Sequence, residues 1–75
     1  MNDKLFKTIL KRYEAAIEDA AYKIDIICEQ TLVIPEHIDI TGEIDKLLQI
    51  IAENEDKVAA MRKYYGEKKA DKAVL

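Results

Sequence analysis

The sequence has few residues that break, bend or cross-link a chain. Its 75 residues include two glycines, one proline, one cysteine and no tryptophan. The sole cysteine, Cys28, has no second thiol with which to form an internal disulfide or hold a zinc ion, which suits a reducing, cytoplasmic setting. No charged and then apolar leader opens the chain, and no long apolar run occurs in it, so we expect neither secretion nor a membrane partner.

Signals of catalysis are equally scarce. The sequence contains no glycine-rich phosphate loop, no nucleophile elbow and no zinc-binding spacing. Its single histidine, His37, lies near Pro35 and is interpreted as a surface or cap residue. Carboxylates are plentiful, but a metal site in a helical bundle needs inward glutamates and a Glu-x-x-His pair, which is absent. The chain is therefore predicted not to be an enzyme and to need no metal or other cofactor.

Apolar and charged residues dominate what remains. Hydrophobic residues make up 49% of the chain and charged residues 36%. A disordered chain has too few apolar residues to build a core, whereas this balance is typical of helices with one apolar and one solvated face. The length allows one domain, covering residues 1–75.

A first helix is predicted at about residues 3–30, with Asn2 or Asp3 as its N-cap. Apolar residues recur in alternating steps of four and three over three heptads, which is the pattern of a coiled coil. Leu5, Ile9 and Ala16 widen this stripe, as expected for a helix with more than one neighbour. The predicted seam consists of Phe6, Leu10, Tyr13, Ile17, Ala20, Ile24 and Ile27.

A second helix is predicted at about residues 42–65, with Thr41 as its N-cap and a left-handed Gly66 as its end. Its seam consists of Ile44, Leu47, Ile51, Asn54, Val58, Met61 and Tyr65. A polar residue in such a row sets register and oligomer state, so Asn54 is assigned that role. The hinge at 31–41 contains Pro35, which breaks any continuous helix, and the tail at 66–75 is expected to fray.

The predicted fold is all-α, an antiparallel two-helix hairpin. A two-helix rod buries less apolar surface than a compact globule of the same mass. Apolar residues also lie off the two seams, and those predicted to face a partner are Ile9, Ile26, Leu48 and Ile50. Both features predict self-association into a four-helix bundle or a larger ring.

The charge is distributed unevenly. Residues 15–56 carry eleven acidic and two basic groups, whereas both ends of the chain are basic. An acidic surface steers a basic partner, and Glu53, Glu55 and Asp56 are predicted to compete for a nucleic-acid-binding surface on it. The predicted function is a small protein-interaction module, an adaptor, inhibitor or assembly factor, whose partners are itself and a second protein.

An alternative function arises at the basic end of such a hairpin. Basic residues interleaved with aromatics hold nucleotides or single-stranded nucleic acid by phosphate pairing and stacking. Against this, the net charge is −3, and of the aromatics at this end only Tyr64 lies off a seam. The residues of this alternative site are Lys11, Arg12, Arg62, Lys63 and Tyr64.

Overall fold

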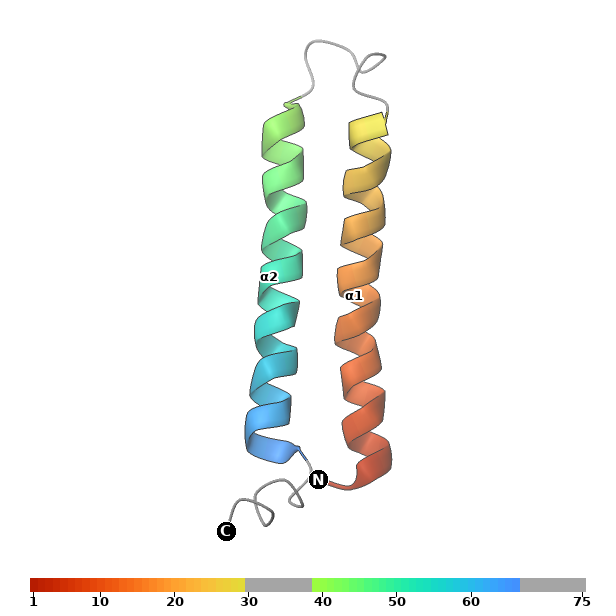
Figure 1. Cartoon of the computed structure of the whole chain (residues 1–75), viewed down its shortest axis with the longest axis vertical. Helices are drawn as coiled ribbons and strands as arrows, with labels where there is room; N and C mark the ends of the chain where they lie inside the picture. Colours follow the sequence, from red (N-terminus) through yellow and green to blue (C-terminus); the bar gives the residue numbers. More distant parts are fainter. Residues whose placement is uncertain (30–38, 67–75) are drawn as a thin grey trace.

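The protein is an all-α helical hairpin, as predicted. The computed structural model describes residues 1–29 and 39–66, which form helices α1 (Asp3–Glu29) and α2 (Ile40–Tyr65). The helices lie side by side and run in opposite directions (Figure 1). We call the end at Asp3 and Tyr65 the terminal end, and the end at Glu29 and Ile40 the distal end. Most of the predicted hinge, with Pro35 and His37, and the tail after Gly66 lie outside the described residues.

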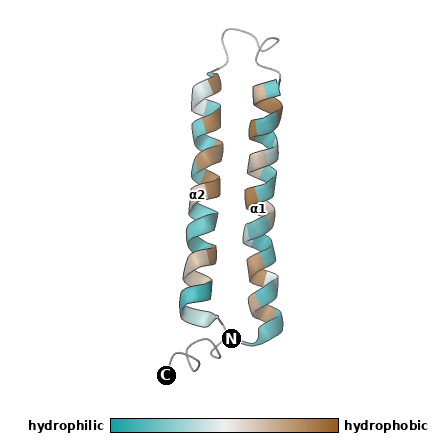
Figure 2. Ribbon diagram, viewed as in Figure 1, coloured by the Kyte–Doolittle hydropathy of each residue, from teal (hydrophilic) through white to brown (hydrophobic). Residues whose placement is uncertain are grey.

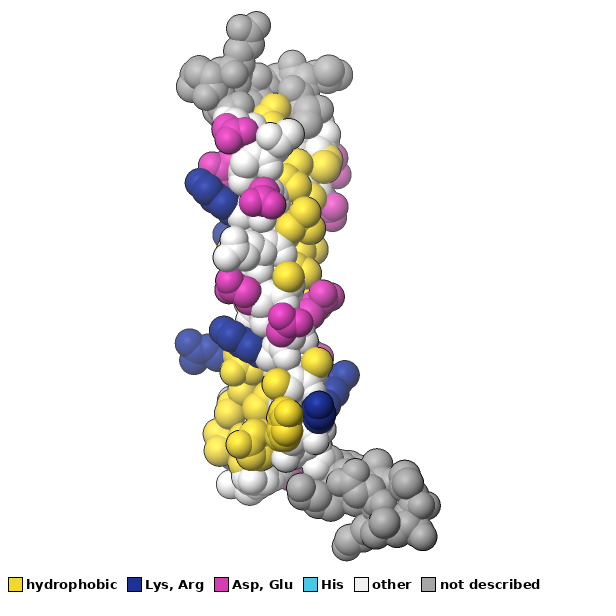
Figure 3. Space-filling model, turned by 90° about the vertical axis from the view of Figure 1, so that its left-hand side faces the viewer, with side chains coloured by type: hydrophobic (Ala, Val, Ile, Leu, Met, Phe, Trp, Pro, Cys, Tyr) yellow, Lys and Arg dark blue, Asp and Glu magenta, His cyan; other side chains and the backbone are white. Residues whose placement is uncertain are grey.

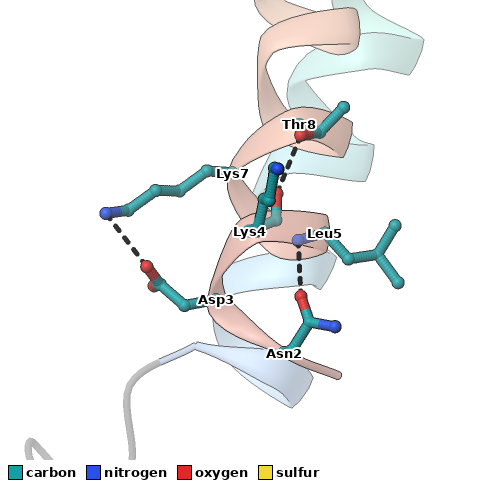
Figure 4. A network of polar contacts seen from close by, with 6 residues as sticks. All are labelled: Asn2, Asp3, Lys4, Leu5, Lys7 and Thr8. Carbon is teal, nitrogen blue, oxygen red and sulfur yellow. Dashed lines mark hydrogen bonds and ion pairs between the residues drawn. The ribbon is translucent and has the colours of Figure 1, made fainter.

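The first turn of α1 is held by its own side chains. The Asn2 side-chain oxygen accepts a hydrogen bond from the Leu5 N–H at 2.8 Å, which identifies Asn2 as the N-cap. Lys7 pairs with Asp3 at 3.1 Å, and the Thr8 hydroxyl donates to the Lys4 carbonyl at 2.8 Å (Figure 4). No glycine or proline follows in α1, so nothing interrupts its 27 residues.

The predicted start of α2 was wrong by two residues. Asp39, not Thr41, is the N-cap: its carboxylate accepts a hydrogen bond from the Gly42 N–H at 3.0 Å. The Thr41 hydroxyl instead donates to the same carboxylate at 3.2 Å. An aspartate caps at least as well as a threonine, and the earlier start also places Ile40 in the helix, where it is half-buried.

The predicted end of α2 is confirmed, but the predicted conformation of Gly66 was wrong. Gly66 has φ −69° and ψ −179°, which is extended rather than left-handed backbone. Its N–H donates to the Arg62 carbonyl at 3.1 Å and closes the last turn without a left-handed residue. A Cβ at this position would collide with that carbonyl oxygen, so the close approach explains the glycine.

The core between the helices is thin. Only Leu10, Ala20 and Met61 are buried among the described residues, at 9%, 1% and 9% exposure. Figure 2 shows hydrophobic residues recurring along both helices, and most other seam residues are half-buried. Tyr65, the last residue of α2, is the exception and is 54% exposed.

The hairpin is also elongated. Its Cα radius of gyration is 17.3 Å, whereas a compact globule of this length has about 11 Å. Each helix is about 40 Å long at 1.5 Å per residue. Within residues 1–29 and 39–66, both long sides of the hairpin are therefore open to a partner.

Candidate functional site

Two contacts between the helices define the two sides of the hairpin. The Lys57 ammonium lies 5.5 Å from the centre of the Tyr13 ring, and the Arg62 guanidinium lies 3.9 Å from the Glu14 carboxylate. Lys57 and Arg62 are five residues apart, which is about 140° around a helix. The two contacts therefore lie on opposite sides, which we call the Lys57 side and the Arg62 side.

The Lys57 side carries large apolar residues on both helices. On α2, Ile50 precedes Lys57 by seven residues, or about two turns, and is 40% exposed. On α1, Ile9 lies one turn before Tyr13 and is half-buried, and Leu5 lies one turn earlier and is 47% exposed. The Lys57 side includes Leu5, Ile9, Ala16, Ile50, Glu53 and Lys57, and also Arg12 and Tyr64, which follow Leu5 and Lys57 by seven residues.

The Arg62 side is a different surface. Leu48 and Glu55 precede Arg62 by fourteen and seven residues, so all three share one strip of α2. Ala52 and Ala59 follow Leu48 and Glu55 by one turn, and all four are exposed, Leu48 by 51%. The residues of the Arg62 side are Glu14, Leu48, Ala52, Glu55, Ala59 and Arg62.

The four residues predicted to face a partner therefore do not form one surface. Ile9 and Ile50 lie on the Lys57 side, and Leu48 lies on the Arg62 side. Ile26 is half-buried on the outer face of α1, one turn after Tyr22. Tyr22 is 64% exposed and was not predicted as a site residue. The sequence feature that could have identified Tyr22 is its place far from the seam, one turn before Ile26.

The acidic stretch at 53–56 is divided between surfaces. Glu53, Glu55 and Asp56 are all exposed, and Glu53 accepts a hydrogen bond from the Gln49 amide at 3.0 Å. Glu53 and Asp56 are three residues apart and neighbour each other, whereas Glu55 lies with Leu48 on the Arg62 side. In Figure 3, a band with acidic side chains separates a hydrophobic stripe in the upper half from a hydrophobic cluster below it.

A cleft lies at the terminal end, where the alternative function was predicted. A cleft of about 470 Å³ lies between the first turn of α1 and the last turn of α2. Phe6, Lys7, Tyr64, Tyr65 and Gly66 help to line it. The terminal half, residues 1–14 and 57–66, carries seven basic and two acidic groups, whereas residues 15–29 and 39–56 carry two basic and ten acidic groups.

Several cations at the terminal end already contact groups of the hairpin. Lys63 lies 5.3 Å from the centre of the Tyr64 ring, and Arg62 and Lys7 contact carboxylates. The Arg62, Lys7, Glu14 and Asp3 side chains are each more than half exposed, so these contacts contribute little to stability. Lys11, Arg12, Lys63 and Tyr64 are exposed as well, and Tyr64 is 61% exposed. The five predicted residues therefore share the terminal end, but only Tyr64 is among those that line the cleft, and the alternative site stays a prediction.

Neither a family model, a curated protein nor a solved structure matches this chain.

Asn54 occupies the seam position predicted for it and is half-buried. Its side-chain amide donates to the Ile50 carbonyl of its own helix at 2.7 Å. This bond satisfies the amide donor within α2, so the donor needs no partner from α1. Short polar side chains commonly bond to their own helix in this way. The assignment of Asn54 to register and oligomer state stays a prediction.

Other kinds of site find no support in the described part of the chain. In residues 1–29 and 39–66, no three His, Cys, Asp or Glu side chains are grouped so that they could hold a metal ion. Neither α1 nor α2 combines the length and apolarity that crossing a membrane requires. The exposed sides of the hairpin and the terminal cleft are therefore the candidate surfaces.

Proposed function

We propose that this protein is a small protein-interaction module that associates with itself and binds a basic partner protein. The observation that carries the proposal is the mismatch between its apolar content and its core. Three apolar side chains are buried in the described residues, while seven large ones are 40% or more exposed. Large apolar patches that one chain leaves open are typical of protein-interaction surfaces.

The two sides suit two different partners. The Lys57 side has three large aliphatic residues and suits a second copy of the hairpin. The Arg62 side has one large aliphatic residue, Leu48, beside small alanines and Glu55. A strip of small residues lets a partner helix approach closely, and the acidic groups of the distal half favour a helix with basic residues. Its partner would be an amphipathic basic helix.

The role of the acidic groups in partner binding is tested with a synthetic amphipathic helix. The peptide carries leucine on one face and lysine and arginine on the other. Reversing Glu53, Glu55 and Asp56 to lysine is expected to weaken binding at least tenfold at low salt, because attraction becomes repulsion. Fluorescence anisotropy of the labelled peptide measures the change, and the wild-type affinity should fall as salt is added.

Single variants serve as matched controls for this experiment. Glu55→Lys should account for most of the loss, whereas Glu53→Lys, with the same change of charge on the other side, should have a smaller effect. Equal binding by the wild type and the triple variant would contradict a role for the acidic stretch. Light scattering on each variant shows whether its oligomeric state has changed.

A second candidate function is favoured by the terminal cleft. Its aromatic lining and the positive charge around it suit a nucleotide or a short single strand, held by stacking and phosphate pairing. Arg62→Ala with Tyr64→Ala is expected to weaken binding of a labelled oligothymidine at least tenfold, since one stacked base contributes about 1–3 kcal/mol. Tyr22→Ala, which removes an exposed tyrosine far from the cleft, is the control. Undetectable binding by the wild type would remove this candidate.

A further inference from the structure

We propose that two copies of the hairpin pack through their Lys57 sides in opposite orientations, with the α1 helices against each other. This inference rests on the proposed self-association and adds the surface and the orientation. Leu5, Ile9 and Ala16 form a row along α1 beside the seam that packs on α2. A second row at helical spacing is what a helix with two helical neighbours presents.

The middle of this row is small. Ala16 is half-buried, and Ala20, one turn later, is buried at 1% exposure. Alanines at the centre of a helix pair let the two backbones approach, while larger residues on either side fill the space that opens beyond them. A second α1 helix crossing here would therefore contact Ala16, while Ala20, already buried in the seam, leaves no bulky side chain in its way.

The charges select the opposite orientation. Tyr13 of α1 lies against Lys57 of α2, and Glu14 of α1 lies against Arg62 of α2. A residue of α1 and a residue of α2 therefore lie at the same height along the hairpin when their numbers add to about 73. The terminal half carries seven basic groups and the distal half ten acidic groups among the described residues. Parallel copies would place the two acidic halves together, whereas opposite copies place each acidic half beside a basic one.

Symmetry then determines which helices meet. A two-fold axis across the helices lays α1 on α1 and α2 on α2, whereas an axis along the helices lays α1 on α2. With the axis midway between Ala16 and Ala20, Ile9 of one copy lies level with Ile27 of the other. The same axis passes α2 near position 55, so Glu53 of one copy lies level with Lys57 of the other. The two-fold symmetry makes this Glu53–Lys57 pair occur twice in the dimer. One apolar pair and one charged pair therefore fit the opposite arrangement.

The orientation is tested by distances between spin labels in the intact protein. The sole cysteine, Cys28, is exposed near the distal end, about ten residues from the proposed axis. Two labels at Cys28 should be about 30 Å or more apart in opposite copies, because ten residues on each copy span about 15 Å. A label at Ala15→Cys, in a Cys28→Ser background, lies near the axis and should give less than about 20 Å.

Pulsed dipolar spectroscopy measures both distances at a concentration where light scattering has established the mass. A long distance at Cys28 with a short one at position 15 is the expected result. Similar distances at both positions in a dimer would overturn the opposite orientation while leaving self-association intact. A monomeric mass without any dipolar coupling would overturn both.

Discussion

Leu10→Ala is expected to lower the free energy of unfolding by about 3 kcal/mol, since losing a buried leucine side chain and leaving a cavity costs about 2–5 kcal/mol. Leu10 is 9% exposed and is one of three buried apolar side chains in the described residues. With so thin a core, no larger hydrophobic interior compensates for the loss. Urea denaturation followed by circular dichroism, at a fixed protein concentration, measures the change.

Leu48→Ala is the matched control for this experiment. It removes the same atoms from a side chain that is 51% exposed, on the Arg62 side. Its effect on the free energy of unfolding should stay below about 1 kcal/mol, because less apolar surface returns to water. Equal losses in the two variants would contradict the packing of α1 on α2 described above.

Ile9→Glu is expected to weaken self-association at least a hundredfold. Ile9 lies in the row that we assign to the second copy, and each dimer contains it twice. Loss of apolar burial from both copies, with the cost of desolvating two carboxylates, amounts to about 3 kcal/mol or more, which corresponds to about two decades in Kd. Sedimentation equilibrium over a range of concentrations measures the dissociation constant.

Leu48→Glu provides the control, because it makes the same kind of change on the Arg62 side and should leave the dissociation constant within a few-fold of wild type. The reverse pattern, with Leu48→Glu disruptive and Ile9→Glu neutral, would move the interface to the Arg62 side. Leu5→Glu is a second variant in the same row as Ile9. It is 47% exposed and lies in the first turn, where a negative charge is tolerated, so it disturbs the hairpin less.

The sequence was sufficient to predict the architecture because its apolar periodicity is long and uninterrupted. The seven predicted seam residues of α1 are all buried or half-buried, as coiled-coil spacing requires. The errors are confined to helix ends. Asp39 and Thr41 are both good caps two residues apart, and the capping preference for aspartate over threonine is too small to decide between them alone. Gly66 allowed a left-handed end, but the close approach of the Arg62 carbonyl could be seen only in the structure.

The candidate surfaces were less predictable. Distance from the seam identified Ile9, Leu48 and Ile50 as surplus apolar residues, but it did not say which of them lie together. That grouping depends on the rotation of each helix about its axis, which the Tyr13–Lys57 and Glu14–Arg62 contacts supply. The rotation of α2 also separates the acidic residues at 53–56. They form one motif in the sequence but lie on different sides of the helix. Tyr22 lies off the seam and belongs to no sequence motif, so it was not predicted as a site residue.

The central claim, that the hairpin completes its core with a second copy, is tested most directly by its native mass. Light scattering after size exclusion, over a hundredfold range of concentration, should give a mass of at least twice the 8.6 kDa of one chain. The mass should approach that of one chain only on strong dilution. A folded monomer of 8.6 kDa across the whole range would contradict the account, and would leave Ile9 and Ile50 exposed for a different protein.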